Sequence, residues 1–263
     1  MAESESLLLT VLGSRGSMPT CGPETATYGG DTSCYLLQAG EERLILDAGT
    51  GLAAAQLSGD GPIHILLTHT HLDHILGLPL FRCLGQRGRT IHLYCKTRGG
   101  LDTAAQLSRL FSPPLWPATL QQYPARVVCH ELTLPLQIGA FAVDGMESAH
   151  PGGSTVLRVR ARGKSLVYAT DFAPDAQKNE ELIALAQGCD LLLYDAQYPL
   201  KEYEQKRAYG HSTTEEGLRV AARCHAKRLL LIHHDPAQTD DCLQRREAAL
   251  GVRFAKQGEV ISL

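Results

Sequence analysis

The stretch HTHLDH, residues 69–74, places three histidines and one aspartate within six positions. A structural histidine usually stands alone with one hydrogen-bond partner. Imidazoles clustered beside a carboxylate repel one another once they are protonated, unless a cation organises them. The apolar run IHILL, residues 63–67, precedes the motif and predicts a buried strand, so the motif occupies the loop that follows. The motif therefore indicates a metal site at the end of a strand.

The motif favours two metals over one. Structural zinc sites draw their four ligands from two separated pairs, so a single ion rarely takes four from one short loop. Further ligands must come from other strand ends, and three segments offer them: ESAHPGGS with His150, VYATDFAP with Asp171, and LLLIHHDP with His233 or His234. Each ends an apolar run and enters a loop, where layered α/β folds gather their sites. Taken singly, each residue is more typical of a cap or a satisfied core partner.

Composition sets the class of protein. The chain has 263 residues, of which 44% are hydrophobic and 20% charged, so it can bury a large core, and we expect a single domain over residues 1–263. Eight cysteines without a CxxC pair favour a reduced, cytoplasmic protein. The net charge of −3 provides no strong field for nucleic acid or an anionic membrane, and we expect no membrane partner. The N-terminal segment lacks the basic region of a signal peptide.

Apolar runs bounded by Gly, Asp or Asn predict strands, and amphipathic stretches between them predict helices. Strands are expected at residues 7–13, 34–40, 43–49, 63–69, 91–95, 155–161, 165–171, 190–196 and 228–234. Helices are expected at residues 97–110, 179–187, 213–224 and 239–250. Because the two types are mixed along the whole chain, we predict a layered α/β fold with helices covering a pair of packed sheets. The proline-rich segment 111–127 forms either a lid or a rigid surface connection.

On these residues the chain resembles the metallo-β-lactamase-fold hydrolases, from about Leu7 to the C-terminus. That family's HxHxDH motif and its later histidine, aspartate and histidine are present here in the same order. The resemblance implies a four-layer αββα sandwich with a dinuclear centre along one edge. By this resemblance, one metal is held by His69, His71 and His150, the other by Asp73, His74 and His233, and Asp171 bridges them. His233 is chosen over His234 because it directly ends the strand.

The resemblance also implies a chemistry. Two divalent ions, Zn or Mn with Fe also compatible, would provide a bridging hydroxide that attacks the substrate. The seven ligands include two carboxylates, so the loaded site keeps a net positive charge. Such a site suits an anionic phosphoester.

Three further motifs resemble the branch that contains tRNase Z and related phosphodiesterases. ILGLPLF (75–81) matches its GLP continuation, and GHSTTEEGLRVA (210–221) matches its HST motif, whose histidine contacts the scissile phosphate and protonates the leaving oxygen. His211 takes that role by carry-over. Asp195, at the end of LLLYD, would orient His211, although the branch commonly has Glu there. The implied catalytic residues are thus Asp73 at the metals, His211 and Asp195.

Two supporting features follow from the same branch. Asp47, in LDAGTG, is expected to buttress the metal loop, and backbone amides of the glycine-rich segments 13–22 and 28–34 are expected to line the pocket.

The substrate is expected to be a small or cyclic phosphodiester. In tRNase Z a flexible arm that grips tRNA lies between the residues matching His150 and Asp171, and here only 20 residues separate them. The chain has neither room for the arm nor a long basic run, which disfavours nucleic acid as a partner. A tRNA 3′-processing endonuclease, or a thioester or lactam hydrolase on the same fold, is the alternative. The sequence leaves open whether the protein forms a homodimer.

Overall fold

Two β-sheets face each other in the computed structural model, which describes residues 6–57 and 59–263. The first sheet runs β13 (Val260–Ser262), β1 (Leu7–Gly13), β2 (Cys34–Ala39), β3 (Glu42–Leu46), β4 (Ile63–Leu66), β5 (Thr90–Cys95) and β6 (Arg126–Glu131). The second runs β12 (Leu229–Ile232), β11 (Leu191–Asp195), β10 (Lys164–Ala169), β9 (Ser154–Ala161), β8 (Phe141–Ser148) and β7 (Leu136–Ile138).

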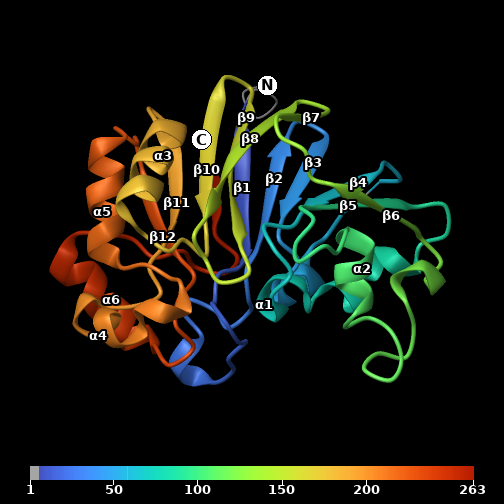
Figure 1. The fold of residues 1–263 in the computed structure, drawn as a ribbon, viewed down its shortest axis with the longest axis horizontal. Helices are drawn as coiled ribbons and strands as arrows, with labels where there is room; N and C mark the ends of the chain where they lie inside the picture. Colours follow the sequence, from blue (N-terminus) through green and yellow to red (C-terminus); the bar gives the residue numbers. More distant parts are fainter. Residues whose placement is uncertain (1–5, 58) are drawn as a thin grey trace.

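Helices lie outside both sheets (Figure 1). They are α1 (Leu72–Ile75), α2 (Thr103–Ser108), α3 (Ala176–Ala186), α4 (Leu200–Lys206), α5 (Thr214–Arg223) and α6 (Asp240–Leu250). Short 3-10 helices occupy Pro23–Thr25, Thr50–Ala54, Leu78–Leu80, Arg82–Gly85, Leu120–Gln122 and Arg207–Tyr209. Among the described residues, no helix combines the length and the apolar character that crossing a membrane requires.

Three apolar clusters separate four layers. The first lies between the sheets and includes Leu37 of β2 and Phe141 of β8. The second packs α1 and α2 on the outer face of the first sheet, and the third packs α3, α5 and α6 on the second sheet. Each sheet contributes to two clusters because side chains alternate between the two faces of a strand. In strand β11, Leu193 faces the first cluster and Leu192 faces the third. The predicted αββα sandwich is confirmed.

The topology brings the site residues to one edge. Strands β3 to β6 pair in parallel, as do β10 to β12, so within each set the carboxyl ends lie together. Asp47, His69, Asp171 and His233 follow the ends of β3, β4, β10 and β12, and Asp195 ends β11. Figure 1 shows α1, which carries part of the metal motif, at the end of the sandwich opposite the C-terminus.

The predicted elements differ from the structure in three respects, and the first is that α4 was not predicted. All nine predicted strands are present, but β6, β7, β8 and β13 were not predicted. Strand β6 is half-exposed and β8 is interrupted by polar residues, so neither shows a continuous apolar run. The helix predicted over 97–110 is wrong at its start: α2 begins at Thr103, because Gly99 and Gly100 adopt the left-handed backbone conformation that ends a helix.

The segment 111–127 is a rigid surface connection. Phe111 and Leu120 are buried in the cluster beneath the first sheet's helices. The indole of Trp116 donates a hydrogen bond to the Tyr123 hydroxyl at 3.1 Å, and that hydroxyl donates to the carbonyl of Pro79 at 3.0 Å. Packing and hydrogen bonds thus fix the segment against the fold, which favours this interpretation over a lid.

Replacement of a leucine between the sheets tests the layer assignment. Leu193→Ala removes a fully buried side chain and is expected to lower the free energy of unfolding by about 2–5 kcal/mol. The matched control Leu115→Ala removes a side chain that is 67% exposed, and its effect should stay within about 0.5 kcal/mol. Urea denaturation measures both. Equal effects would contradict the placement of Leu193 between the sheets.

Candidate metal centre

The first group of candidate ligands gathers around one oxygen of Asp171. It consists of His69, His71, His150 and Asp171, and one ligand atom from each lies within 4.8 Å of the others. Asp171 Oδ1 lies 3.6 Å from His69 Nε2 and 3.5 Å from His150 Nε2. His71 Nδ1 lies 3.1 Å from His150 Nε2. These four side chains surround a volume that an ion could share.

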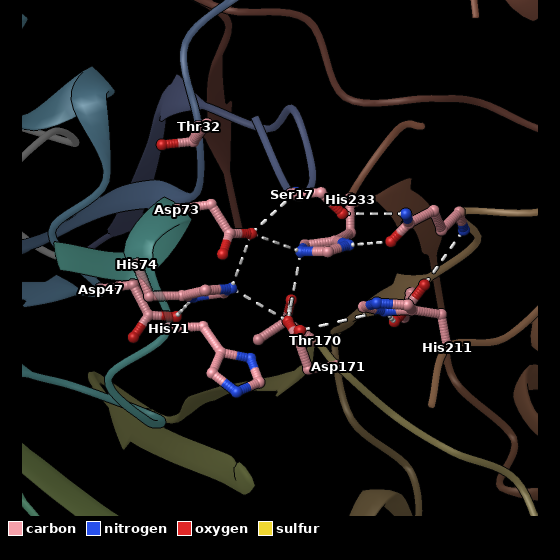
Figure 2. Close-up of polar contacts among 12 residues, drawn as sticks. Ser17, Thr32, Asp47, His71, Asp73, His74, Thr170, Asp171, His211 and His233 are labelled. Atoms are coloured by element: carbon pink, nitrogen blue, oxygen red, sulfur yellow. Dashed lines mark hydrogen bonds and ion pairs between the residues drawn. The ribbon is translucent and has the colours of Figure 1, made fainter. Parts of the chain in front are cut away.

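The second group gathers around the other oxygen of the same carboxylate. Asp171 Oδ2 lies 3.0 Å from His74 Nε2 and 3.2 Å from His233 Nε2. Asp73 Oδ2 approaches the same two nitrogens at 3.2 and 3.1 Å. In Figure 2 the rings of His74 and His233 both point toward Asp73 and Asp171. The two oxygens of Asp171 therefore face different groups, which is the arrangement of a bridging ligand.

Hydrogen bonds fix which nitrogen each histidine presents to the centre. His74, His150 and His233 each place Nδ1 against an oxygen that can only accept, so Nδ1 carries a proton and Nε2 is the nitrogen that faces the centre. The acceptors are Asp47 Oδ2 at 2.8 Å for His74, the Gly210 carbonyl at 2.9 Å for His150, and Gln197 Oε1 at 2.8 Å for His233. Each ring is thus oriented as a metal ligand requires.

The donor set fits divalent ions. Nε2 of His69 is buried and has no hydrogen-bond partner among the described residues. A buried polar atom without a partner costs roughly 1–3 kcal/mol, and a cation at this position would remove that cost. Imidazole nitrogens with carboxylate oxygens form the donor set that zinc, manganese and iron accept. These residues could therefore hold metal ions.

Protons and metals compete for the same nitrogens. Burial, together with the charge of His74, keeps the pKa of His69 well below its usual value, so its ring is neutral. Burial also opposes a proton on His74 and His233, but neighbouring carboxylates dominate: they hold the pKa of His74 well above its usual value and raise the pKa of His233 to about 9. Despite burial, His233 and His74 hold the pKa of Asp171 well below its usual range. The carboxylates thus attract positive charge to this point.

Asp47 supports the metal loop as predicted from the sequence. The carboxylate is fully buried, and its Oδ1 accepts the backbone N–H of Thr68 at 2.7 Å. Its Oδ2 accepts the Tyr168 hydroxyl at 2.7 Å as well as the ring of His74. Asp47, Asp171 and His233 have φ values of 57°, 48° and 62°. Such backbone costs about 1–3 kcal/mol per residue and is retained where the surroundings demand it.

The glycine-rich segment 13–22 positions the second group. A Cβ on Gly16 would overlap Nδ1 of His233, so only glycine fits there. The backbone N–H of Ser17 donates to Asp73 Oδ2 at 2.8 Å. The fully buried Arg15 donates to the carbonyls of Gly29 and Gln238, both at 2.8 Å. The amide of Ser17 therefore orients a candidate ligand, and Ser17 also lines the adjoining cavity, the place that the sequence predicted for this segment.

His211 lies at the opening of the centre. Its Nδ1 donates to Asp195 Oδ2 at 3.0 Å, and its ring stacks on His233 with centroids 4.9 Å apart. Asp195 is fully buried and also accepts the backbone N–H of Gln197 at 3.0 Å, so the shorter aspartate reaches His211. A cavity of about 390 Å³ is bounded by His211 together with Ser17, Thr70, His71, Leu72, Asp73 and Asp171.

The adjacent histidines 233 and 234 point to opposite sides. His234 Nε2 donates to the Ala255 carbonyl at 2.9 Å, and its ring packs edge-on against Tyr28 and Phe254. The structure thus brings His233 to the candidate ligands and directs His234 into the apolar cluster beneath α6.

Two supporting residues were not predicted. Gln197, which holds His233, follows Asp195 by two positions, and a polar residue just after a strand was a signal that could have revealed it. Tyr168 lies inside the apolar strand β10, and nothing local distinguishes it from a core residue.

Comparison with known proteins places the chain in a family. A model described as "Beta-lactamase superfamily domain" matches residues 42–234. The chain belongs to the beta-lactamase superfamily. The matched range contains every candidate ligand and His211, so the superfamily assignment covers the whole edge where they meet.

The matches to individual proteins extend over most of the chain. An uncharacterized protein of Mycobacterium leprae is 31% identical over 247 residues, which cover 87% of this chain and 78% of the relative. The ribonuclease Z of Halorubrum lacusprofundi is 27% identical over 307 residues, which cover 97% of this chain and 94% of the relative. Among solved structures, the metallo-beta-lactamase fold protein YhfI from Bacillus subtilis has a TM-score of 0.75 at 22% identity. The match covers 98% of this chain and 100% of YhfI. The last likeness concerns the fold alone.

A matched pair of substitutions tests the orientation of the two histidines. His233→Gln removes an imidazole from the centre and is expected to lower the metal content from about two ions per chain to about one. His234→Gln keeps a donor for the Ala255 carbonyl and should retain the full content. Mass spectrometry of dialysed protein measures both, with circular dichroism to verify folding. The reverse pattern would contradict the assignment of His233 as the ligand.

Proposed function

We propose that the chain is a dinuclear metal-dependent phosphodiesterase that acts on a small or cyclic phosphodiester. The observation that carries the proposal is the position of His211: it bounds the same cavity as Asp73 and Asp171 while Asp195 fixes its Nδ1. A thioester or lactam hydrolase needs the metals but does not need a histidine at this place.

Seven side chains would hold the metals. One ion would bind His69, His71 and His150, the other Asp73, His74 and His233, with Asp171 between them. When bound, two divalent ions would lower the pKa of a water and neutralise the oxygens of a phosphate. Zinc, manganese and iron all suit these donors.

His211 would act on the leaving group. Asp195 accepts a hydrogen bond from the Nδ1–H group and orients the ring, so Nε2 is the atom that can carry a second proton. A phosphodiester releases an alkoxide, which is a poor leaving group until an acid protonates its oxygen. His211 would supply that proton while the carboxylate of Asp195 keeps the ring oriented.

The size of the substrate follows from the segment between His150 and Asp171. It forms β9 and β10, two strands of the second sheet, so this segment has no arm to grip a large RNA. Processing of tRNA 3′ ends is the second candidate, and the identity to the ribonuclease Z of Halorubrum lacusprofundi favours it. The net charge of −3 supports the small substrate, because nucleic-acid grips depend on basic residues.

The cellular compartment belongs to the same proposal. All eight cysteines are free thiols, and four of them, including Cys34 and Cys95, are fully buried. Unpaired cysteines are typical of a reducing compartment, which supports a cytoplasmic enzyme.

Substitution of the bridging residue tests the metal centre. Asp171→Asn removes the charge that both groups share, so it should release both ions and abolish turnover, whereas His71→Ala should weaken only the first ion. Elemental analysis of purified protein gives the ions per chain. Full occupancy and turnover in both variants would overturn the assignment.

A leaving-group comparison tests the role of His211. His211→Ala should keep its metals but lose roughly 10²–10⁴-fold in kcat toward an alkyl phosphodiester, the range for a positioned acid. The loss should be smaller for a nitrophenyl phosphodiester, since nitrophenolate hardly needs a proton. Asp195→Asn should give a weaker version of the same pattern. Equal turnover by wild type and His211→Ala on both substrates would refute this role.

A further inference from the structure

A second cavity adjoins the one that holds His211. It has a volume of about 410 Å³ and shares Thr70, His71 and Leu72 with the first. The shared residues belong to the metal loop, and His71 is the exposed member of the first ligand group. A substrate whose phosphodiester lies at the metals can therefore extend past His71 into this space.

The walls of the second cavity are apolar on one side. Leu72, Ile75, Leu101 and Leu110 line it, contributed by the metal loop, by α1 and by both ends of α2. Such a wall can pack against the carbon atoms of a substrate, but it offers no polar contact that would distinguish one end group from another.

One arginine of the cavity already has partners. Arg98 donates to Glu147 Oε2 at 2.9 Å and to Thr155 Oγ1 at 2.8 Å. Its guanidinium packs beneath the loop after His150, where a Cβ on Gly153 would overlap it. Arg98 therefore fixes the shape of the wall, and its guanidinium is already engaged by Glu147, a carboxylate that Lys96 Nζ also contacts at 2.8 Å.

The other arginine has no partner. Arg109 is exposed, and within the described part of the chain its guanidinium makes no hydrogen bond or ion pair. Among residues 6–57 and 59–263, no acidic side chain lines the cavity beside it. Its charge is therefore uncompensated on the cavity wall.

The helix that ends just before Arg109 is tied to the metal loop. Gln106 lies three residues earlier and so on the same face of α2, and its Oε1 accepts the hydroxyl of Thr70 at 3.0 Å. Its Nε2 donates to the carbonyls of Lys96 and Leu101 at 2.8 and 2.9 Å. The base of Arg109 thus has a fixed position relative to His71, while its guanidinium is free to meet a ligand.

We propose that the second cavity is a subsite for an anionic group, a carboxylate or a phosphate, at the far end of the substrate, and that Arg109 binds it. This inference rests on the proposed phosphodiesterase function. A guanidinium presents a planar fork of donors that matches the oxygens of either group. The preferred substrate is then a phosphodiester with a second negative charge, separated from the first by an apolar spacer.

Three series of nitrophenyl alkyl phosphates test the proposal, with alkyl chains of increasing length that end in a methyl, a carboxylate or a phosphonate group. Wild-type protein should show a kcat/KM at least about 10-fold higher for the best charged ester than for its methyl counterpart, the value expected of a hydrogen bond to a charged group. The carboxylate and phosphonate arms show which anion is preferred. Arg109→Gln should reduce this ratio toward one.

Arg87→Gln is the matched control, because Arg87 is also exposed, has no partner among the described residues and does not line the cavity. It should keep the wild-type ratio. If wild type cleaves the methyl-terminated series with the same kcat/KM as the two charged series, the subsite is overturned and the phosphodiesterase proposal stays intact. If wild type cleaves none of the three series, both the subsite and the phosphodiesterase proposal are overturned.

A binding measurement gives a readout apart from turnover. Calorimetry compares alkylphosphonates with the same compounds bearing a terminal carboxylate, on the metal-loaded protein. The carboxylate should tighten binding to wild type about 10-fold and should have a much smaller effect in Arg109→Gln. Equal gains in wild type and Arg109→Gln would overturn the role of Arg109.

Discussion

The carboxylate of Asp171 is the constraint on which the rest of the structure depends. Its two oxygens face histidines that come from loops of both sheets, and it lies buried at a φ of 48°. Histidine lone pairs and carboxylates at such short distances, away from water, are unfavourable unless a positive charge lies among them. The loops around Asp171 therefore hold the candidate ligand side chains in fixed orientations around a point that suits cations.

The layers explain how loops so distant in sequence meet. Apolar clusters on both faces of each sheet fix the strands, and the parallel strands of each sheet end at the same edge. Beyond the ligands, Asp47, Gln197 and the carbonyl of Gly210 fix the rings from behind. Because these supports come from three different segments, the geometry at the metals depends on the whole sandwich.

Much of this could be predicted from the sequence, for identifiable reasons. The HTHLDH motif and the polar residues that end apolar runs are local signals, and the family resemblance chose His233 over His234; together they named the residues that the structure brings together. Strand β6 and the start of α2 were not predicted, because half-exposed strands lack a clear apolar pattern and Gly99 and Gly100 interrupt an otherwise helical stretch. The supports from Tyr168 and Gly210, and the free charge of Arg109 beside the metal loop, depend on tertiary contacts that no local pattern encodes.

The central claim is that Asp171 bridges two ions, and anomalous diffraction from crystals of the metal-loaded protein tests it most directly. The account predicts two anomalous peaks, one beside each oxygen of Asp171, the first within reach of His69, His71 and His150 and the second of Asp73, His74 and His233. A single peak, or an ion held instead by His211 and Asp195, would contradict it.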